Sequence, residues 1–213
     1  MDTIQIRNAE DRDIGQLVRV DREAFSGLPE YLFFTKDHFR AWLEVFPEGF
    51  FVACLEERVI GYASVQIIRY DLDNPVATWC EATDSGFIRK THNPCGNAVY
   101  GVSICVSGHA SGARIGKKLM FAGIRRFSAM KHIQYGVVVS RVPGYYKVVD
   151  QIPIQKYVFG TRESGRPIDP LLNFYVGCGF RIARVMSDYI EDPPSRNYGV
   201  LMAFSNPNYD GGS

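Results

Sequence analysis

Apolar residues follow two patterns that alternate along the chain. Short runs of alternating or continuous apolar residues predict strands, and apolar residues at every third or fourth position predict amphipathic helices. Neither internal repeats nor low-complexity tracts interrupt this order. The expected strands are residues 3–7, 50–55, 59–68, 98–106, 135–141, 180–186 and 199–204, and the expected helices are residues 11–25, 36–46, a segment ending near 131, 154–159 and 169–177.

Two segments between these elements are long for connections within one domain. Residues 75–96 are polar and end in Pro, Asn and Gly, and residues 143–167 form a second irregular stretch. Such segments fit lids better than linkers, so we expect both to cover the side on which an acceptor binds. Residues 206–213 have the composition of disorder. We therefore expect one domain, residues 1–205, followed by a flexible tail.

The composition is that of a well-packed globular protein. Hydrophobic residues make up 46% of the 213 residues, and the formal net charge is +1. A nucleic-acid-binding domain would be clearly basic, and no apolar run reaches the length of a membrane span. We therefore expect neither nucleic acid nor a membrane among the partners.

The five cysteines form no C-x-x-C pair, and their number is odd. With no signal-peptide pattern at the start, they predict reduced thiols in a cytoplasmic protein. The four histidines and the acidic residues show no metal-ligand spacing. We expect no metal site.

The turn after the strand at 98–106 carries the first indication of chemistry. A loop of small residues, 107–112, leads into a helix with Gly116 in its first turn. Backbone N–H groups at a helix N-terminus bind phosphate, and Arg114, Lys117 and Lys118 add positive charge. The glycine spacing fits neither the dinucleotide fingerprint nor the P-loop. The turn predicts a phosphorylated ligand; the alternative is an ordinary strand–helix turn with surface lysines.

The order of elements resembles the GNAT (Gcn5-related N-acyltransferase) superfamily over nearly the whole chain. In that family this turn carries the motif Q/R-x-x-G-x-G/A, which wraps the pyrophosphate of acyl-CoA. The resemblance implies that acetyl-CoA, or another acyl-CoA, is the cosubstrate, with its pyrophosphate over residues 113–117. The corresponding residues are Ser111, Gly112, Ala113, Arg114, Ile115 and Gly116, followed by Lys117, and only Gly116 matches the strict motif.

The same resemblance implies how the thioester is held. In this superfamily the backbone of the strand before the turn pairs with the pantetheine amides, and Ile104, Cys105 and Val106 occupy that stretch. The N–H of Val106 is the expected donor to the oxyanion that forms during acyl transfer. Because Cys105 lies between two apolar neighbours, we expect its side chain to pack rather than to act as a nucleophile.

The stretch LLNFYVGCGF, residues 171–180, resembles the late helix and strand of the family, with its Y-x-x-x-G-F pattern. Tyr175 falls on the tyrosine that often protonates the leaving thiolate of CoA. A phenol suits this step because its pKa of about 10 is close to that of an alkyl thiol. The alternative is that Tyr175 packs in the core of an amphipathic helix.

A narrower resemblance covers residues 91–201. The elements THNPCGNAVYGV, SRVPGYYK and DYIEDPPSRNYGVLM resemble a bacterial GNAT subgroup that includes acyltransferase domains joined to carbon–nitrogen hydrolases. More distantly, they resemble the GNAT-like loading domains of polyketide synthases, which use a Thr and a His. At these two positions the chain has Ser140 and Tyr175, so the pair is absent in its usual form.

The base that accepts the proton of the acceptor amine has no clear motif. Glu81, Asp84 and His92 are candidates that could act through water; the alternative for each is a solvated loop position. His109, in the phosphate-binding turn, is a candidate contact for CoA or an exposed loop residue. Five aromatic residues are expected either to line the acceptor pocket or to belong to the core: Phe33, Phe34, Phe39, Trp42 and Phe46.

Together these features imply an α/β (α+β) fold of the GNAT type, a mixed, mostly antiparallel twisted sheet flanked by helices in one domain. The implied activity is transfer of an acetyl group from acetyl-CoA to an amine of a small molecule or a peptide. One alternative is a malonyl-CoA decarboxylase or S-acyltransferase that acts with a carrier protein. The other is a non-catalytic sensor that binds acyl-CoA without a base.

Overall fold

A computed structural model describes residues 4–108 and 114–211. None of the helices in these ranges is long and apolar enough to cross a bilayer. The strands are β1 (Ile4–Asn8), β2 (Phe50–Leu55), β3 (Arg58–Ile68), β4 (Ala98–Val106), β5 (Tyr135–Arg141), β6 (Arg181–Met186) and β7 (Gly199–Ser205). The helices are α1 (Ile14–Ala24), α2 (Lys36–Val45), α3 (Trp79–Thr83), α4 (Ile115–Ser128), α5 (Ile154–Phe159) and α6 (Pro170–Val176).

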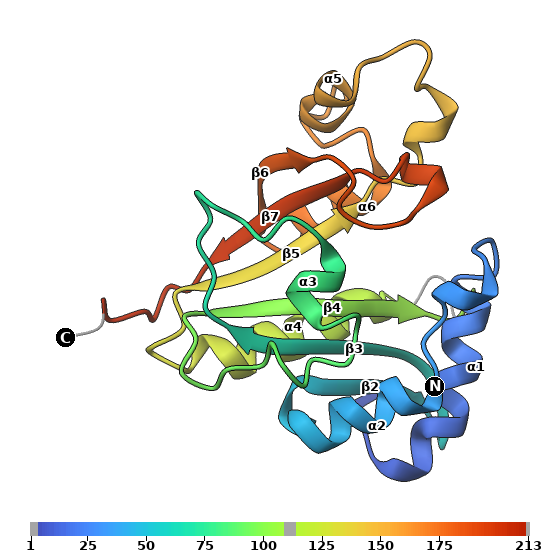
Figure 1. Ribbon diagram of the computed structural model, residues 1–213, viewed down its shortest axis with the longest axis vertical. Coiled ribbons are helices and arrows are strands. Elements are labelled where there is room, and N and C mark those ends of the chain that lie inside the picture. The colour runs from blue at the N-terminus through green and yellow to red at the C-terminus, as the bar shows by residue number, and fades with distance from the viewer. Residues whose placement is uncertain (1–3, 109–113, 212–213) are drawn as a thin grey trace.

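The strands form one sheet in the order β1-β2-β3-β4-β5-β7-β6 (Figure 1). Neighbouring strands are antiparallel except β4 and β5, which are parallel. A parallel pair needs a long crossover connection, and α4 lies within it. The mixed, mostly antiparallel sheet with flanking helices confirms the expected fold class.

Successive side chains of a strand point to opposite faces of the sheet, and each face of this sheet carries its own apolar layer. On one face, α1 and α2 pack against Val52 and Tyr62. On the other face, α4 packs against Phe51 and Ala53. In Figure 1, α2 and α3 lie in front of the sheet and α4 lies behind it. The β5–β7 half is covered by α5 and α6.

Strands β4 and β5 stay paired over a short stretch. Residues 98–100 pair with residues 135–137, although β4 continues to Val106 and β5 to Arg141. Figure 1 shows the two arrows diverging beyond this stretch. The divergence opens the sheet near its centre.

Gly101 lies where the divergence begins. A Cβ atom at this position would stand 2.9 Å from Cγ1 of Val138 on β5. Glycine therefore allows the backbone of β4 to approach β5 closely at the last point before the strands separate.

The segment 75–96, expected to be irregular, contains α3. Its N-terminus has a capping box, in which the Thr78 side chain accepts a hydrogen bond from the Glu81 N–H at 3.2 Å and the Glu81 carboxylate accepts one from the Thr78 N–H at 3.2 Å. These reciprocal bonds stabilise a helix of a single turn that the irregular composition had concealed.

The ordered structure extends past residue 205. Asn206, expected to begin a flexible tail, is 8% exposed. Its Nδ2 donates to the carbonyls of Ile133 at 2.7 Å and Met130 at 3.2 Å. Helix α4 ends at Ser128, slightly before the expected end near residue 131, and the Ser128 carbonyl accepts a hydrogen bond from Nδ2 of Asn208.

We expect Gly101→Ala to lower the free energy of unfolding by about 1–3 kcal/mol, because the added methyl must displace Val138. The matched control is Gly15→Ala in α1, where a Cβ meets nothing within 4 Å and alanine favours the helix. Denaturant titration of both variants tests this. Equal stability of the two variants would show that β4 does not need glycine at this point.

Candidate active site: the cleft between β4 and β5

A cleft of about 810 Å³ occupies the space between the diverging strands. Its walls include residues from both faces of the sheet, so the cleft passes through the sheet. On the α1 side the wall includes Asp21, Phe25, Phe34, Trp79, Arg141 and Glu191; on the α4 side it includes Gly116, Met120, Ile124, Phe174, Tyr175 and Phe180.

Strand β4 forms one wall of the cleft with Ile104, Cys105 and Val106. These residues pair with β3 on their other edge and lie beyond the stretch that pairs with β5. The edge of β4 that faces the cleft therefore has main-chain N–H and C=O groups without a strand partner. The Cys105 side chain packs in the apolar layer of α1, and burial raises the pKa of its thiol.

Of the residues expected to bind phosphate, the structure describes Arg114, Ile115, Gly116 and Lys117. Ser111, Gly112 and Ala113, together with His109, lie outside the described residues. Arg114 is exposed and has a φ of +54°, the left-handed region that favours glycine. Its position is the one at which the family motif has its first glycine.

The next residues connect α4 to α6. Ile115, the first residue of α4, is buried in the apolar layer between α4 and the sheet. Gly116 borders the cleft, and a Cβ there would stand 3.3 Å from the ring of Phe174 on α6. The Nζ of Lys117 lies beside Gly177 at the end of α6, 3.1 Å from where a Cβ of Gly177 would stand. The C-terminus of a helix attracts positive charge, so the end of α6 favours this position of the ammonium group.

Tyr175 is on the cleft wall and is 9% exposed. Its ring packs edge-on against Phe174 and Phe180. Burial raises the pKa of its hydroxyl well above the usual range, and the positive charge of Arg141 lowers it in part. Within the described part of the chain, no hydrogen-bond acceptor or donor engages this hydroxyl, so it is available to a ligand in the cleft.

Ser140 lies on β5 and borders the same cleft. It is buried, and its Oγ donates to the carbonyl of Arg141 at 2.8 Å. Ser140 and Tyr175 are the positions that correspond to the Thr and the His of the loading domains. The structure places both residues on the wall of one cavity.

The structure does not bring Glu81 or His92 to this cleft. Glu81 is exposed, and its carboxylate caps α3. Nδ1 of His92 accepts a hydrogen bond from the N–H of Ile67 at 3.2 Å, and its ring stacks on Phe46. Since Ile67 pairs with Val99 near the start of β4, His92 lies roughly 20 Å along the strand from Val106. Burial lowers the pKa of His92.

Asp84 and most of the expected pocket aromatics also lie elsewhere. Asp84 forms an ion pair with Lys90 at 3.5 Å. Phe39 and Trp42 are fully buried in the layer under α1 and α2, and Phe46 packs on Phe127. Of the five aromatics, Phe34 is the one that lines the cleft.

The two long segments differ in their relation to the cleft. Trp79 and Cys80 of the segment 75–96 border it, and Nε1 of Trp79 donates to the carbonyl of Val102 on β4 at 3.2 Å. In the segment 143–167, Pro143 borders the cleft, whereas Tyr157 and Val158 pack with the apolar layer of β5–β7. Among the residues that line the cleft, the second segment contributes Pro143 alone, and its role in covering the acceptor side stays a prediction.

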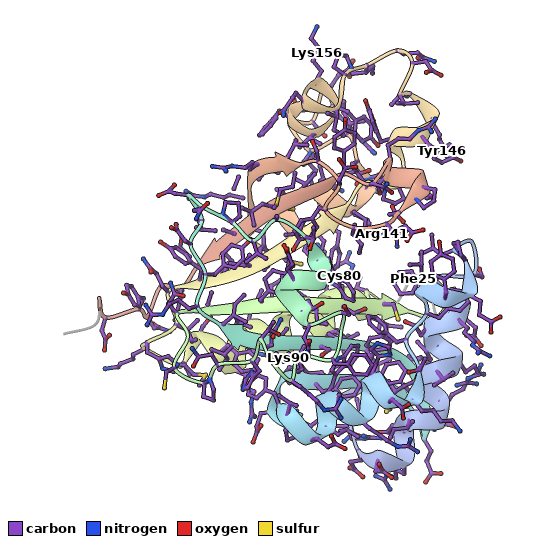
Figure 2. All side chains as sticks on the ribbon, viewed as in Figure 1. Phe25, Cys80, Lys90, Arg141, Tyr146 and Lys156 are labelled. Atoms are coloured by element: carbon purple, nitrogen blue, oxygen red, sulfur yellow. The ribbon has the colours of Figure 1, made fainter. Side chains whose placement is uncertain are left out.

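An ion pair that sequence analysis missed lies on the α1 side of the cleft. Arg141 donates to Oδ1 of Asp192 from Nε at 2.8 Å and from Nη2 at 2.6 Å. The guanidinium also lies over the ring of Phe25 at 5.3 Å, and Figure 2 shows the two residues near each other at the same end of the molecule. Asp192 is buried and also accepts a hydrogen bond from the N–H of Ser195. Its partner lies 51 positions away, so no local pattern marks the pair.

Comparisons with known proteins agree with this architecture. The model of the acetyltransferase (GNAT) family matches residues 14–140. The chain is 37% identical over 209 residues to the uncharacterized N-acetyltransferase YkwB of Bacillus subtilis (strain 168), covering 98% of this chain and 91% of that protein. It is 29% identical over 205 residues to the probable hydrolase YhcX of the same organism, covering 96% of this chain but 39% of that protein.

The fold is similar to the loading GNATL domain of CurA from Lyngbya majuscula, with a TM-score of 0.82, 21% sequence identity, and coverage of 95% of this chain and 98% of that chain. This likeness concerns the fold. The similarity to a hydrolase and to a loading domain confirms the resemblance inferred from the sequence. With a family match that includes the central strand and α4 and a relative aligned over nearly its whole length, the chain belongs to the acetyltransferase (GNAT) family.

Proposed function

We propose that this protein transfers an acetyl group from acetyl-CoA to a primary amine by direct attack of the amine on the thioester. The observation that carries the proposal is the cleft through the sheet between β4 and β5, with Tyr175 on its wall. The cosubstrate enters from the α4 side and the acceptor from the α1 side, so the two reactants meet inside the sheet.

The α4 side suits an acyl-CoA. The first turn of α4 offers N–H groups to the pyrophosphate, for which we assign residues 113–117. Beyond residue 100 the cleft-facing edge of β4 has main-chain groups without a partner on β5, which can pair with the amides of pantetheine. We assign this contact to Ile104, Cys105 and Val106.

The reaction forms a C–N bond and breaks a C–S bond. Negative charge develops on the carbonyl oxygen, where the N–H of Val106 is the proposed donor. The leaving thiolate takes the proton of the Tyr175 hydroxyl. Burial disfavours the tyrosinate that results, and the nearby positive charge of Arg141 favours it. Burial prevails, and Arg141 offsets part of its effect on the pKa of Tyr175.

The α1 side suits an amine with an apolar body, in a small molecule or a peptide. Phe25, Phe34 and Trp79 form an aromatic wall. At the rim, the Glu191 carboxylate accepts a hydrogen bond from the Tyr31 hydroxyl. A carboxylate at this entrance attracts a protonated amine.

Arg141 favours a second candidate, decarboxylation of malonyl-CoA with S-acyl transfer to a carrier protein. Asp192 engages its Nε and Nη2, and Nη1 has no hydrogen-bond acceptor among the described residues. This edge of the guanidinium could bind a malonyl carboxylate.

Incubation with acetyl-CoA and a panel of amines, followed by a thiol assay for free CoA, tests the first candidate, acetyl transfer to an amine. Release of carbon dioxide from malonyl-CoA would indicate the second, and binding without either release would indicate a sensor.

We expect Gly116→Glu to weaken CoA binding more than tenfold, or by more than about 1.4 kcal/mol, because a carboxylate in the first turn of α4 repels the pyrophosphate. Its Cβ also meets Phe174, so pantetheine, which lacks the phosphates, serves as the reference ligand and should lose less affinity than CoA. The control is Gly15→Glu, the same charge change in the first turn of α1. Calorimetry with both ligands measures these affinities; equal losses for CoA and pantetheine would place the phosphate site elsewhere.

We expect Tyr175→Phe to lower turnover by about 10²–10⁴, the range for a positioned proton donor, with CoA affinity retained. The loss should shrink with a thioester whose thiol is more acidic, because a better leaving group needs less protonation. Steady-state kinetics with both thioesters measure this. Tyr145→Phe removes another buried hydroxyl, one that donates to the Ile152 carbonyl, and should leave turnover unchanged. Full turnover of Tyr175→Phe with every thioester would remove Tyr175 from the mechanism.

A further inference from the structure

A buried carboxylate without an ion-pair partner lies beside the cleft. Asp21, on α1, is 0% exposed and borders the cleft. Its Oδ1 accepts a hydrogen bond from the Tyr62 hydroxyl at 2.6 Å, and its Oδ2 accepts one from the N–H of Phe34 at 3.0 Å. Buried carboxylates are normally paired with a cation, and within the described residues Asp21 has none.

The hydrogen bonds continue from Asp21 to the surface of the cleft. The Tyr62 hydroxyl lies 3.3 Å from Oγ of Ser103 on β4. Ser103 borders the cleft. It lies three residues after Tyr100, the last β4 residue that pairs with β5. Tyr62 is fully buried, and its ring is held by edge-on contacts with Phe39 and Phe50. A fixed chain of two hydroxyl groups therefore joins the cleft to the carboxylate.

The other cleft carboxylates in the described part of the chain are engaged differently. Asp192 is paired with Arg141 at 2.6 Å, so its negative charge is compensated. Glu191 is exposed at the rim and accepts a hydrogen bond from Tyr31. Asp21 alone of these three combines deep burial with a path of hydroxyl groups into the cavity.

We propose that Ser103, Tyr62 and Asp21 form a proton relay that takes the proton of the acceptor amine during acyl transfer. This inference rests on the proposed function. As the C–N bond forms, the amine N–H gives its proton to Oγ of Ser103. Ser103 passes its own proton to the oxygen of Tyr62, and Tyr62 passes its proton to Oδ1 of Asp21. Both hydroxyl groups are regenerated, Asp21 becomes neutral, and exchange with water resets it after the products leave.

Ser103 is the catalytic residue in this relay because it touches the acceptor, and Tyr62 and Asp21 are positioning residues that act through it. The distance of 3.3 Å between Tyr62 and Ser103 is long for an O–H···O bond. Such catalytic bonds commonly shorten when the substrate binds.

The groups around Asp21 set the pH at which the relay operates. Burial raises the pKa of Asp21, whereas the hydrogen bonds from Tyr62 and Phe34 and the charge of Arg22 on the same helix lower it, and burial prevails. From β4, Cys105 faces it with a thiol whose pKa is raised. Asp21 is thus a stronger base than an exposed aspartate. Turnover should fall as the pH drops through this raised pKa.

The experiment compares the pH dependence of kcat in variants that each interrupt the relay. Tyr62→Phe, Ser103→Ala and Asp21→Asn should each lower kcat about 100-fold or more, with the Kd of CoA unchanged. Each should also lose the acid limb of the wild-type profile. Ser103→Thr, which keeps a hydroxyl group, should restore most of the turnover.

The matched control is Tyr157→Phe. The Tyr157 hydroxyl also donates to a buried carboxylate, Asp169, at 3.0 Å, but outside the cleft. Its loss should cost similar stability and leave both kcat and the acid limb unchanged. Tyr62→Phe and Ser103→Ala enzymes with wild-type profiles would overturn the relay while leaving the acyltransfer intact. Absence of turnover in the wild-type protein with every amine would overturn the proposed function, and the relay with it.

Discussion

The parallel ladder between β4 and β5 ends after residue 100 on β4, and the features described above depend on this early end. A sheet that remained paired would satisfy the main-chain groups of both strands and would leave no passage between its faces. Gly101, the first residue after the ladder, lets the strands stay close before they separate, because a Cβ there would meet Val138. The strands then separate, and side chains from both apolar layers reach one cleft.

Two buried aspartates on the α1 side of this cleft are stabilised in different ways. Asp192 is paired with the guanidinium of Arg141 and orients that cation toward the cavity. Asp21 accepts hydrogen bonds from the Tyr62 hydroxyl and the Phe34 N–H. Both donors are neutral, so no positive charge compensates its carboxylate. A carboxylate of the first kind fixes geometry, and one of the second kind retains the capacity to change its protonation.

The segment 75–96 joins the two halves of the sheet on the α1 side of the cleft. Trp79 donates from Nε1 to Val102 of β4 and from its backbone N–H to the carbonyl of Tyr189, beyond β6. The Tyr189 hydroxyl is hydrogen-bonded to that of Tyr100 on β4. These contacts hold β4 and the β6–β7 connection at a fixed separation although the strands between them diverge. The width of the cleft is therefore determined by side chains outside the ladder.

The sequence by itself determined the order of the elements, because apolar periodicity is a local property: the short helix at 154–159 and the strand at 135–141 were predicted with their observed bounds. The pattern T-x-x-E at Thr78–Glu81 is typical of a capping box, although we did not predict α3 from it, and Glu81 caps α3 instead of reaching the cleft. The pairing of Asp21 with Tyr62 joins residues 41 positions apart, and that of Arg141 with Asp192 joins residues 51 apart. Only the tertiary structure decided these contacts, because they depend on strand register and on how α1 packs across the sheet.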